Sequence, residues 1–171
     1  MPRTVLKVLG VLLLCLGFVL PTTNAIAQQK SLKEELVGTW MAVSNITTRP
    51  DGTKTDTFGP NPKGIWVFDS NGHLAFITTA SNLPKFSSNN RATGTADENK
   101  AVVQGSIAYI ATYTVDEADK SFTMQIEGAT FPNWAGTTQK RMAAISGDEL
   151  IITNPAGSTG GTTESKWRRA K

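Results

Sequence analysis

The feature that most constrains the fold of this chain is a series of eight short β-patterned segments, most of which are joined by short turns. In each segment apolar, β-branched or aromatic residues alternate with polar ones, which is typical of strands that bury one face. The segments span residues 37–48, 65–69, 73–79, 107–115, 121–128, 137–145, 149–153 and 163–170. Asn71-Gly72, between the second and third segments, is the strongest short-range hairpin signal. The sequence therefore predicts an all-β meander.

Eight sequential antiparallel strands favour an up-and-down barrel, because closure removes the two exposed sheet edges. A β-sandwich is the alternative architecture, but hairpin connections favour the barrel over Greek-key crossovers. Two capping-box pairs, Ser31 with Glu34 and Thr95 with Glu98, add helical features. They predict one helical turn at 31–36 and a short helix at 97–104, between the third and fourth strands.

The first 27 residues have the layout of a secretory signal peptide. Arg3 and Lys7 precede the apolar run 8–20, and Ala25-Ile26-Ala27 forms a small-x-small cleavage site. The alternative is a retained N-terminal anchor, but the apolar run is shorter than the roughly 20 residues that a membrane span needs. We expect cleavage after Ala27, export to the periplasm or the medium, and a single domain over residues 28–171.

Composition argues against several classes of function. The one cysteine, Cys15, lies in the apolar run without the neighbours that lipidation needs, so the domain is predicted to contain no disulfide. Residues 1–27 hold two of the 17 basic residues and none of the 14 acidic ones, so the remainder is nearly neutral and predicts no nucleic-acid surface. The single histidine, His73, follows a hairpin turn. No catalytic triad, metal site or cofactor motif is predicted, and catalysis is not favoured.

Both ends of the domain carry a tryptophan beside residues that suit barrel closure. Gly38-Thr39-Trp40 begins the first strand and Trp167-Arg168-Arg169 ends the last, a pattern that resembles the lipocalins. More narrowly, the chain resembles a bacterial lipocalin-like domain family over stretches 36–43, 64–72, 84–91, 98–115 and 127–141. The resemblance implies that Trp40 lies across the closed end of the barrel with a basic residue, Arg168, stacked on it, in a structural role.

Strand alternation then indicates which side chains face the interior. Tyr109 and Tyr113 are expected to form walls with polar tips. Two loop aromatics, Phe131 and Trp134, are expected either to fold over the barrel as a plug or to line its mouth. The predicted ligand-binding set is Trp66, Phe68, Tyr109, Tyr113, Met124, Phe131, Trp134 and Arg141.

Lipocalin-like barrels include carriers, inhibitors and a few isomerases or cyclases, so the resemblance leaves the function open among these. The favoured interpretation is a protein that binds a small hydrophobic or amphipathic molecule in the barrel. One alternative is an isomerase or cyclase that uses a buried Glu127 beside Tyr109 or Arg141 as its acid–base. That alternative depends on the register between strands 107–115 and 121–128, which their turn does not fix. The other is a protein-binding or inhibitor module with a filled barrel.

Overall fold

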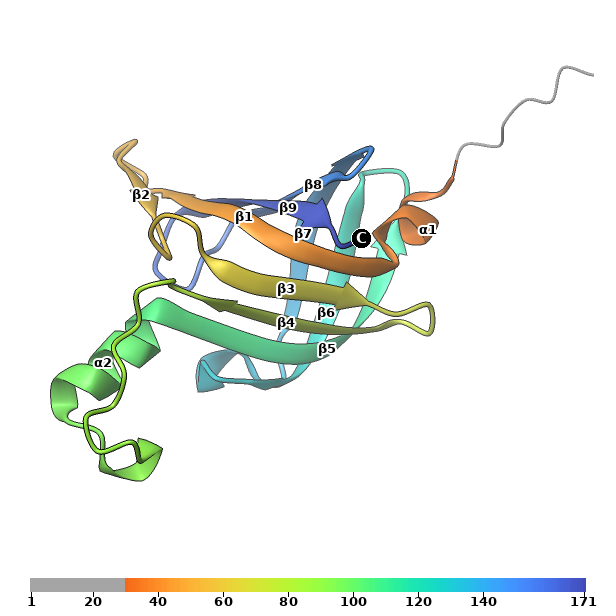
Figure 1. Ribbon diagram of the computed structural model, residues 1–171. Helices are drawn as coiled ribbons and strands as arrows, with labels where there is room; N and C mark the ends of the chain where they lie inside the picture. Colours follow the sequence, from red (N-terminus) through yellow and green to blue (C-terminus); the bar gives the residue numbers. More distant parts are fainter. Residues whose placement is uncertain (1–29) are drawn as a thin grey trace, which may run out of the picture.

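The computed structural model describes residues 30–171 and shows a closed antiparallel β-barrel (Figure 1). The signal-peptide prediction for residues 1–27 lies outside the described residues. The strands are β1 (Gly38–Thr48), β2 (Lys54–Asp56), β3 (Lys63–Phe68), β4 (His73–Thr79), β5 (Ser106–Asp116), β6 (Ser121–Ala129), β7 (Thr138–Ser146), β8 (Glu149–Asn154) and β9 (Thr162–Arg169). The helices are α1 (Leu32–Leu36) and α2 (Ala96–Gly105), with 3₁₀ turns η1 (Arg91–Thr93) and η2 (Pro132–Trp134).

The barrel closes through β1, which pairs with both β3 and β9. Each of the strands from β3 to β8 pairs antiparallel with the next along the chain, as a meander requires. The three-residue β2 is an arm that pairs only with the far end of β1, where Ile46 lies opposite Asp56. The predicted eight-stranded barrel is confirmed, and so are the N-terminal helical turn and the helix between β4 and β5.

Local hydrogen bonds explain why the chain turns where it does. In the β3–β4 hairpin, the Asp69 carboxylate accepts from the backbone N–H groups of Asn71 (2.9 Å) and His73 (2.8 Å). Gly72 takes a φ of 94°, a left-handed conformation that glycine adopts without a steric penalty. At α1, the Ser31 hydroxyl accepts from Glu34 N and the Glu34 carboxylate accepts from Ser31 N, which is the predicted capping box.

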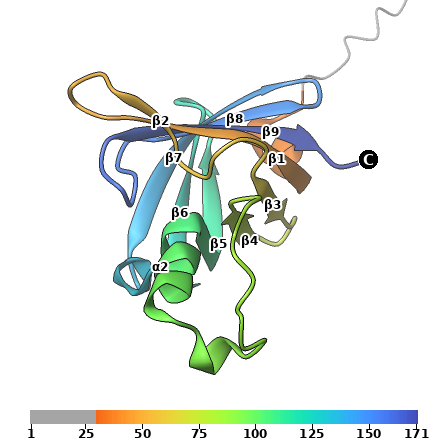
Figure 2. The same cartoon turned by 60° about the vertical axis from the view of Figure 1, so that its left-hand side comes forward.

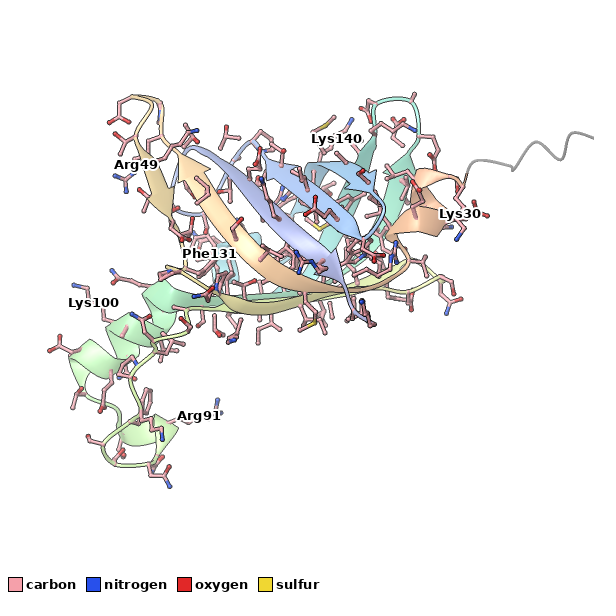
Figure 3. All side chains as sticks on the ribbon, turned by 45° about the horizontal axis from the view of Figure 1, so that its top comes forward. Lys30, Arg49, Arg91, Lys100, Phe131 and Lys140 are labelled. Carbon is pink, nitrogen blue, oxygen red and sulfur yellow. The ribbon has the colours of Figure 1, made fainter. Side chains whose placement is uncertain are left out.

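The two ends of the barrel differ. The closed end carries α1 and the short turns after β3, β5 and β7. The loop end carries the longer segments 49–62, 80–105, 130–137 and 155–161. The segment 80–105, which contains α2, projects away from the barrel (Figures 1 and 2), and its Arg91 and Lys100 lie well clear of the strands (Figure 3). No residue of α2 is buried.

The core fills the barrel from the closed end. Alternate residues of β5 point inward as predicted, since Ile107, Tyr109, Ala111 and Tyr113 are all buried. The same alternation buries Phe122, Met124 and Ile126 on β6. The barrel interior is therefore largely occupied by the protein's own side chains.

Candidate functional site

The closed end is sealed by Trp40, whose side chain is fully buried. Its indole Nε1 donates to Leu36 O at 2.9 Å, which ties the end of α1 to the first strand. The guanidinium of Arg169 stacks on the indole with Cζ 4.0 Å from the ring centroid, and it donates to Val37 O (3.1 Å) and Glu35 O (2.6 Å). The predicted stacking interaction is therefore present, but it is made by Arg169.

The prediction of Arg168 for this role was wrong, because Arg168 is exposed on the outer face of β9. Trp167 is buried, and successive side chains on a strand alternate, so residue 169 shares the inner face. The alternation from Trp167 was available in the sequence and would have identified the correct residue.

Interlocking aromatic rings fill the middle of the barrel. Trp66 stacks parallel to Phe68 at 5.1 Å and meets Tyr109 edge-on at 5.7 Å. Phe68 in turn meets the edge of Tyr113 at 5.2 Å, and the Tyr113 hydroxyl donates to Asp69 O at 2.7 Å. Burial raises the pKa of Tyr113, so this hydroxyl stays protonated and keeps donating. These contacts make the centre of the barrel a packed core.

Three members of the predicted ligand-binding set consequently lie in the core, away from the internal cavity. Phe68, Tyr113 and the fully buried Met124 pack towards the closed end. Another three, Trp66, Tyr109 and Trp134, line the cavity together with Arg141.

The cavity itself lies under the loop end and has a volume of about 60 Å³. It holds a few water molecules or one small chemical group, whereas pockets for drug-sized ligands typically measure roughly 300–1,000 Å³. Besides the four predicted residues, its lining comprises Asn45, Thr57, Phe58, Phe76, Ile107, Ile152, Asn154, Gly157, Ser158, Thr159, Thr163 and Ser165. Most of these residues could not be predicted from the sequence, because they come from seven separate segments that only the barrel brings together.

Two buried polar atoms of the lining have no hydrogen-bond partner within residues 30–171. They are the indole Nε1 of Trp66, a donor, and Oδ1 of Asn45, an acceptor. Their side chains are only 2% and 7% exposed. An unsatisfied buried polar group costs about 1–3 kcal/mol, so both atoms gain from any ligand or water that pairs with them.

Arg141 is the charged residue of the cavity, and it is 4% exposed. Its Nη1 donates to Lys140 O at 2.9 Å and its Nη2 to the side-chain oxygen of Gln139. Its guanidinium lies 6.0 Å from the ring centroid of Trp134. Burial lowers the pKa of Arg141, since the low-dielectric interior disfavours the charged form. Burial likewise raises the pKa of Tyr109 well above its usual range, so its phenol stays neutral beside the arginine.

The loop aromatics fold back onto the barrel. Trp134, in η2, meets Tyr109 edge-on at 5.7 Å, and Phe131 packs against Trp134 at the same separation. Both side chains are partly buried against the core. Trp134 thus forms part of the cavity wall, while Phe131 supports it from outside.

The structure contradicts a buried Glu127. A bulge falls between Ile110 and Ala111 in the β5–β6 pairing, and Glu127 lies exposed on the outer face. Arg141 points inward, so the two residues cannot form an internal pair. The isomerase or cyclase alternative therefore loses the residue that was proposed as its general acid and base.

Phe58 lines the cavity at its loop end. Its side chain is 8% exposed and lines both the cavity and an external groove of about 330 Å³ at the base of the projecting segment. Leu83, Pro84 and Gln104 form part of the far wall of that groove. Thr57 and Phe58 therefore lie between the interior of the barrel and a surface depression.

Residues 30–171 contain no group of three His, Cys, Asp or Glu side chains arranged to hold a metal ion. His73 is exposed beside the β3–β4 hairpin turn. None of the helices described is long and apolar enough to cross a membrane.

The chain belongs to the lipocalin-like domain family, which matches residues 37–170. Among solved structures it is similar to a point mutant of the fluorescent protein UnaG, with 12% identity and a TM-score of 0.39 over 81% of this chain and 98% of that one. It is also similar to the REP1-NXSQ fatty acid transporter, with 10% identity and a TM-score of 0.37 over the same shares of the two chains. No curated protein gives a significant match.

Proposed function

We propose that this protein binds a small hydrophobic or amphipathic molecule at the loop end of its barrel. The observation that carries the proposal is the cavity below Phe58, whose walls combine large apolar side chains with buried polar atoms that lack partners. Mostly apolar walls with a few placed polar groups are typical of small-molecule sites. A core selected for stability alone would not be expected to bury polar atoms that lack hydrogen-bond partners, because their burial is costly.

The size of the cavity limits how the ligand sits. About 60 Å³ accepts one end of a molecule, and the rest is expected to extend past Thr57 and Phe58 into the groove beside the projecting segment. Phe58 is followed by Gly59, which has a φ of 66°, in a loop without regular structure. A rotation of the Phe58 side chain would join the two volumes without disturbing the strands.

Native mass spectrometry of the protein purified from its own host, before and after organic extraction, tests the proposal directly. A reproducible extractable adduct of low molecular mass supports a binding protein. Fluorescence of the apolar dye N-phenyl-1-naphthylamine provides a second readout in the extracted protein. The Ile152→Phe variant fills the cavity and should weaken dye binding, whereas Ile110→Phe, on the outer face, should not. The absence of both adduct and dye response would overturn the proposal.

A protein-binding module is the second candidate, because the centre of the barrel is filled and no residue of α2 is buried. Val103 of α2 is 77% exposed. This candidate predicts that Ile152→Phe has no functional effect, while changes on the projecting segment do. The dye experiment therefore separates the two functions.

We also propose that the protein is exported, on the strength of the leader pattern in residues 1–27. The prediction is a mature chain that begins at Gln28. N-terminal sequencing of the protein recovered from the periplasm or the medium checks it, and an intact N-terminus would contradict cleavage.

A further inference from the structure

The charge of Arg141 is not compensated within the described part of the chain. Ion pairs within 4 Å in residues 30–171 are formed by Lys120 with Glu117 and by Lys140 with Asp119, both at the surface. Two of the five N–H donors of the Arg141 guanidinium have acceptors, and both acceptors are neutral. A charged group that is almost wholly buried is costly unless an opposite charge or a full set of hydrogen bonds compensates it.

The rest of the cavity wall reinforces the same polarity. Every other lining residue is uncharged, so the cavity carries the full positive charge of Arg141. The unpartnered Nε1 of Trp66 adds a second donor. Asn45 Oδ1 is the one unpartnered acceptor of the lining, and it suits a water or hydroxyl that accompanies a bound group. The site thus offers donors and a cation where a ligand must supply acceptors and negative charge.

If Arg141 had only a structural role, another residue of the described chain would be expected to pair with its charge. The nearest sequence candidate for an ion pair, Glu127, lies on the outside of the barrel. The ring of Trp134 is 6.0 Å away, the outer limit for a cation–π contact, whereas Arg169 stacks on Trp40 at 4.0 Å. The two arginines therefore differ: Arg169 has a close stacking partner in Trp40, whereas the charge of Arg141 meets only two neutral acceptors and a ring 6.0 Å away.

We infer that the ligand carries an anionic head group of the carboxylate class and that Arg141 is the residue that binds it inside the cavity. This inference rests on the binding function proposed above. A carboxylate is planar and matches the guanidinium fork with two parallel hydrogen bonds, and it is small enough for the space available. The apolar part of the ligand then lies along Phe58 and the groove beyond it.

The test compares decanoate with decan-1-ol, which share a ten-carbon chain and differ in the head group. Isothermal titration calorimetry of the extracted protein should give decanoate at least about tenfold tighter binding, since hydrogen bonds to charged groups are worth more than neutral ones. Arg141→Gln should remove that preference and change decan-1-ol binding less than threefold. Arg141→Lys, which keeps the charge but loses the fork, should be intermediate. Arg168→Gln, an exposed change on β9, is the matched control and should bind like the parent.

Each outcome decides between the inference and the function on which it rests. If both probes bind and Arg141→Gln keeps the preference for decanoate, the role of Arg141 is overturned while the binding function stands. If neither probe binds the parent protein, both fail. Carboxyl ¹³C NMR of labelled decanoate on the unmodified protein decides the matter should Arg141→Gln not fold. A bound carboxyl pKa below that of free decanoate supports the contact with Arg141, and a raised one overturns it.

Discussion

At the residue scale, Arg169 connects three elements, because its guanidinium extends from the last strand, β9, and contacts both the first strand and the turn of α1. It stacks on Trp40 and donates to two backbone carbonyls, that of Glu35 in the last turn of α1 and that of Val37 just after it. Those carbonyls belong to the group that a helix end leaves without an intrahelical partner. The side chain thus satisfies the end of α1 while it holds that turn over the bottom of the barrel.

Replacing Arg169 by Ala should therefore lower the free energy of unfolding by about 2–4 kcal/mol, from two charge-assisted hydrogen bonds and a cation–π contact. The neighbouring Arg168→Ala is the matched control and should change stability by less than about 0.5 kcal/mol, because its side chain is exposed. Urea denaturation followed by tryptophan fluorescence measures both. Equal effects of the two variants would contradict the assignment of the closing contact to Arg169.

The contact at the closed end of the barrel also depends on Gly38. Its φ is 130°, and a Cβ at this position would lie 3.0 Å from Arg169 Nη1. Gly38→Ala should cost about 1–3 kcal/mol, through backbone strain and displacement of the arginine. Gly128→Ala on β6 is the control, since it has no positive φ and its nearest neighbour would be 3.8 Å away. Thermal denaturation of the two variants should separate them clearly, and similar midpoints would show that Gly38 is replaceable.

At the scale of elements, the projecting segment 80–105 is ordered by local hydrogen bonds, without a core of its own. The Glu98 carboxylate accepts from Ser87 N and from Thr95 N, both at 2.8 Å, and so joins α2 to the loop that precedes it. These backbone donors hold the pKa of Glu98 below its usual value of 4.5. The order of the segment is thereby linked to the ionisation of one exposed carboxylate.

The sign of the pH effect follows from the lowered pKa of Glu98. A carboxylate whose pKa is lower in the folded state stabilises that state above its unfolded pKa, and the contribution disappears as the pH falls through the folded value. The amide proton shifts of Ser87 and Thr95 should therefore titrate together with a midpoint below 4.5. In Glu98→Gln they should lose this titration, while the Asn71 amide, which donates to Asp69, should still respond to acid and serves as the control. Independent midpoints for Ser87 and Thr95 would argue against a shared carboxylate.

The bounds of the strands and helices could be predicted well from the sequence. The direction in which side chains point beyond a β-bulge could not. Alternation located the strands because most inward-facing residues are apolar. Ser31, Thr95 and Asn71-Gly72 marked helix starts and a hairpin by their side-chain chemistry. The β5–β6 bulge has no such mark. It adds one residue to β6 after Ile126 and so changes the facing of Gly128 and Ala129, whereas Glu127 lies outside by the alternation that buries Phe122, Met124 and Ile126.

At the scale of the whole molecule, the barrel is filled at one end and hollow at the other, and the sequence predicted the barrel without predicting this division. Phe68 and Tyr113 have the same inward parity as Trp66 and Tyr109, yet the first pair lies in the core and the second beside the cavity. The depth of a residue along the barrel axis decides whether it lies in the core or beside the cavity. That depth depends on the stagger of the strands and on which loops fold inward. The cavity is an outcome of assembly that no single segment encodes.

The same division predicts how a ligand reaches the cavity. Thr57 and Phe58 both line the cavity and the groove at the base of the projecting segment, and Phe58 has the larger side chain, so Phe58 should control exchange more than affinity. For Phe58→Leu we expect the association and dissociation rates of decanoate each to rise about tenfold, with the dissociation constant changed less than about threefold. Arg141→Gln should act differently, chiefly by raising the dissociation rate, because it removes a contact made only in the complex. Stopped-flow tryptophan fluorescence can measure both, since Trp66 and Trp134 line the cavity. Unchanged rates in Phe58→Leu would mean that the ligand passes between other loops, and an effect confined to affinity would make Phe58 a wall of the site with no role as its gate.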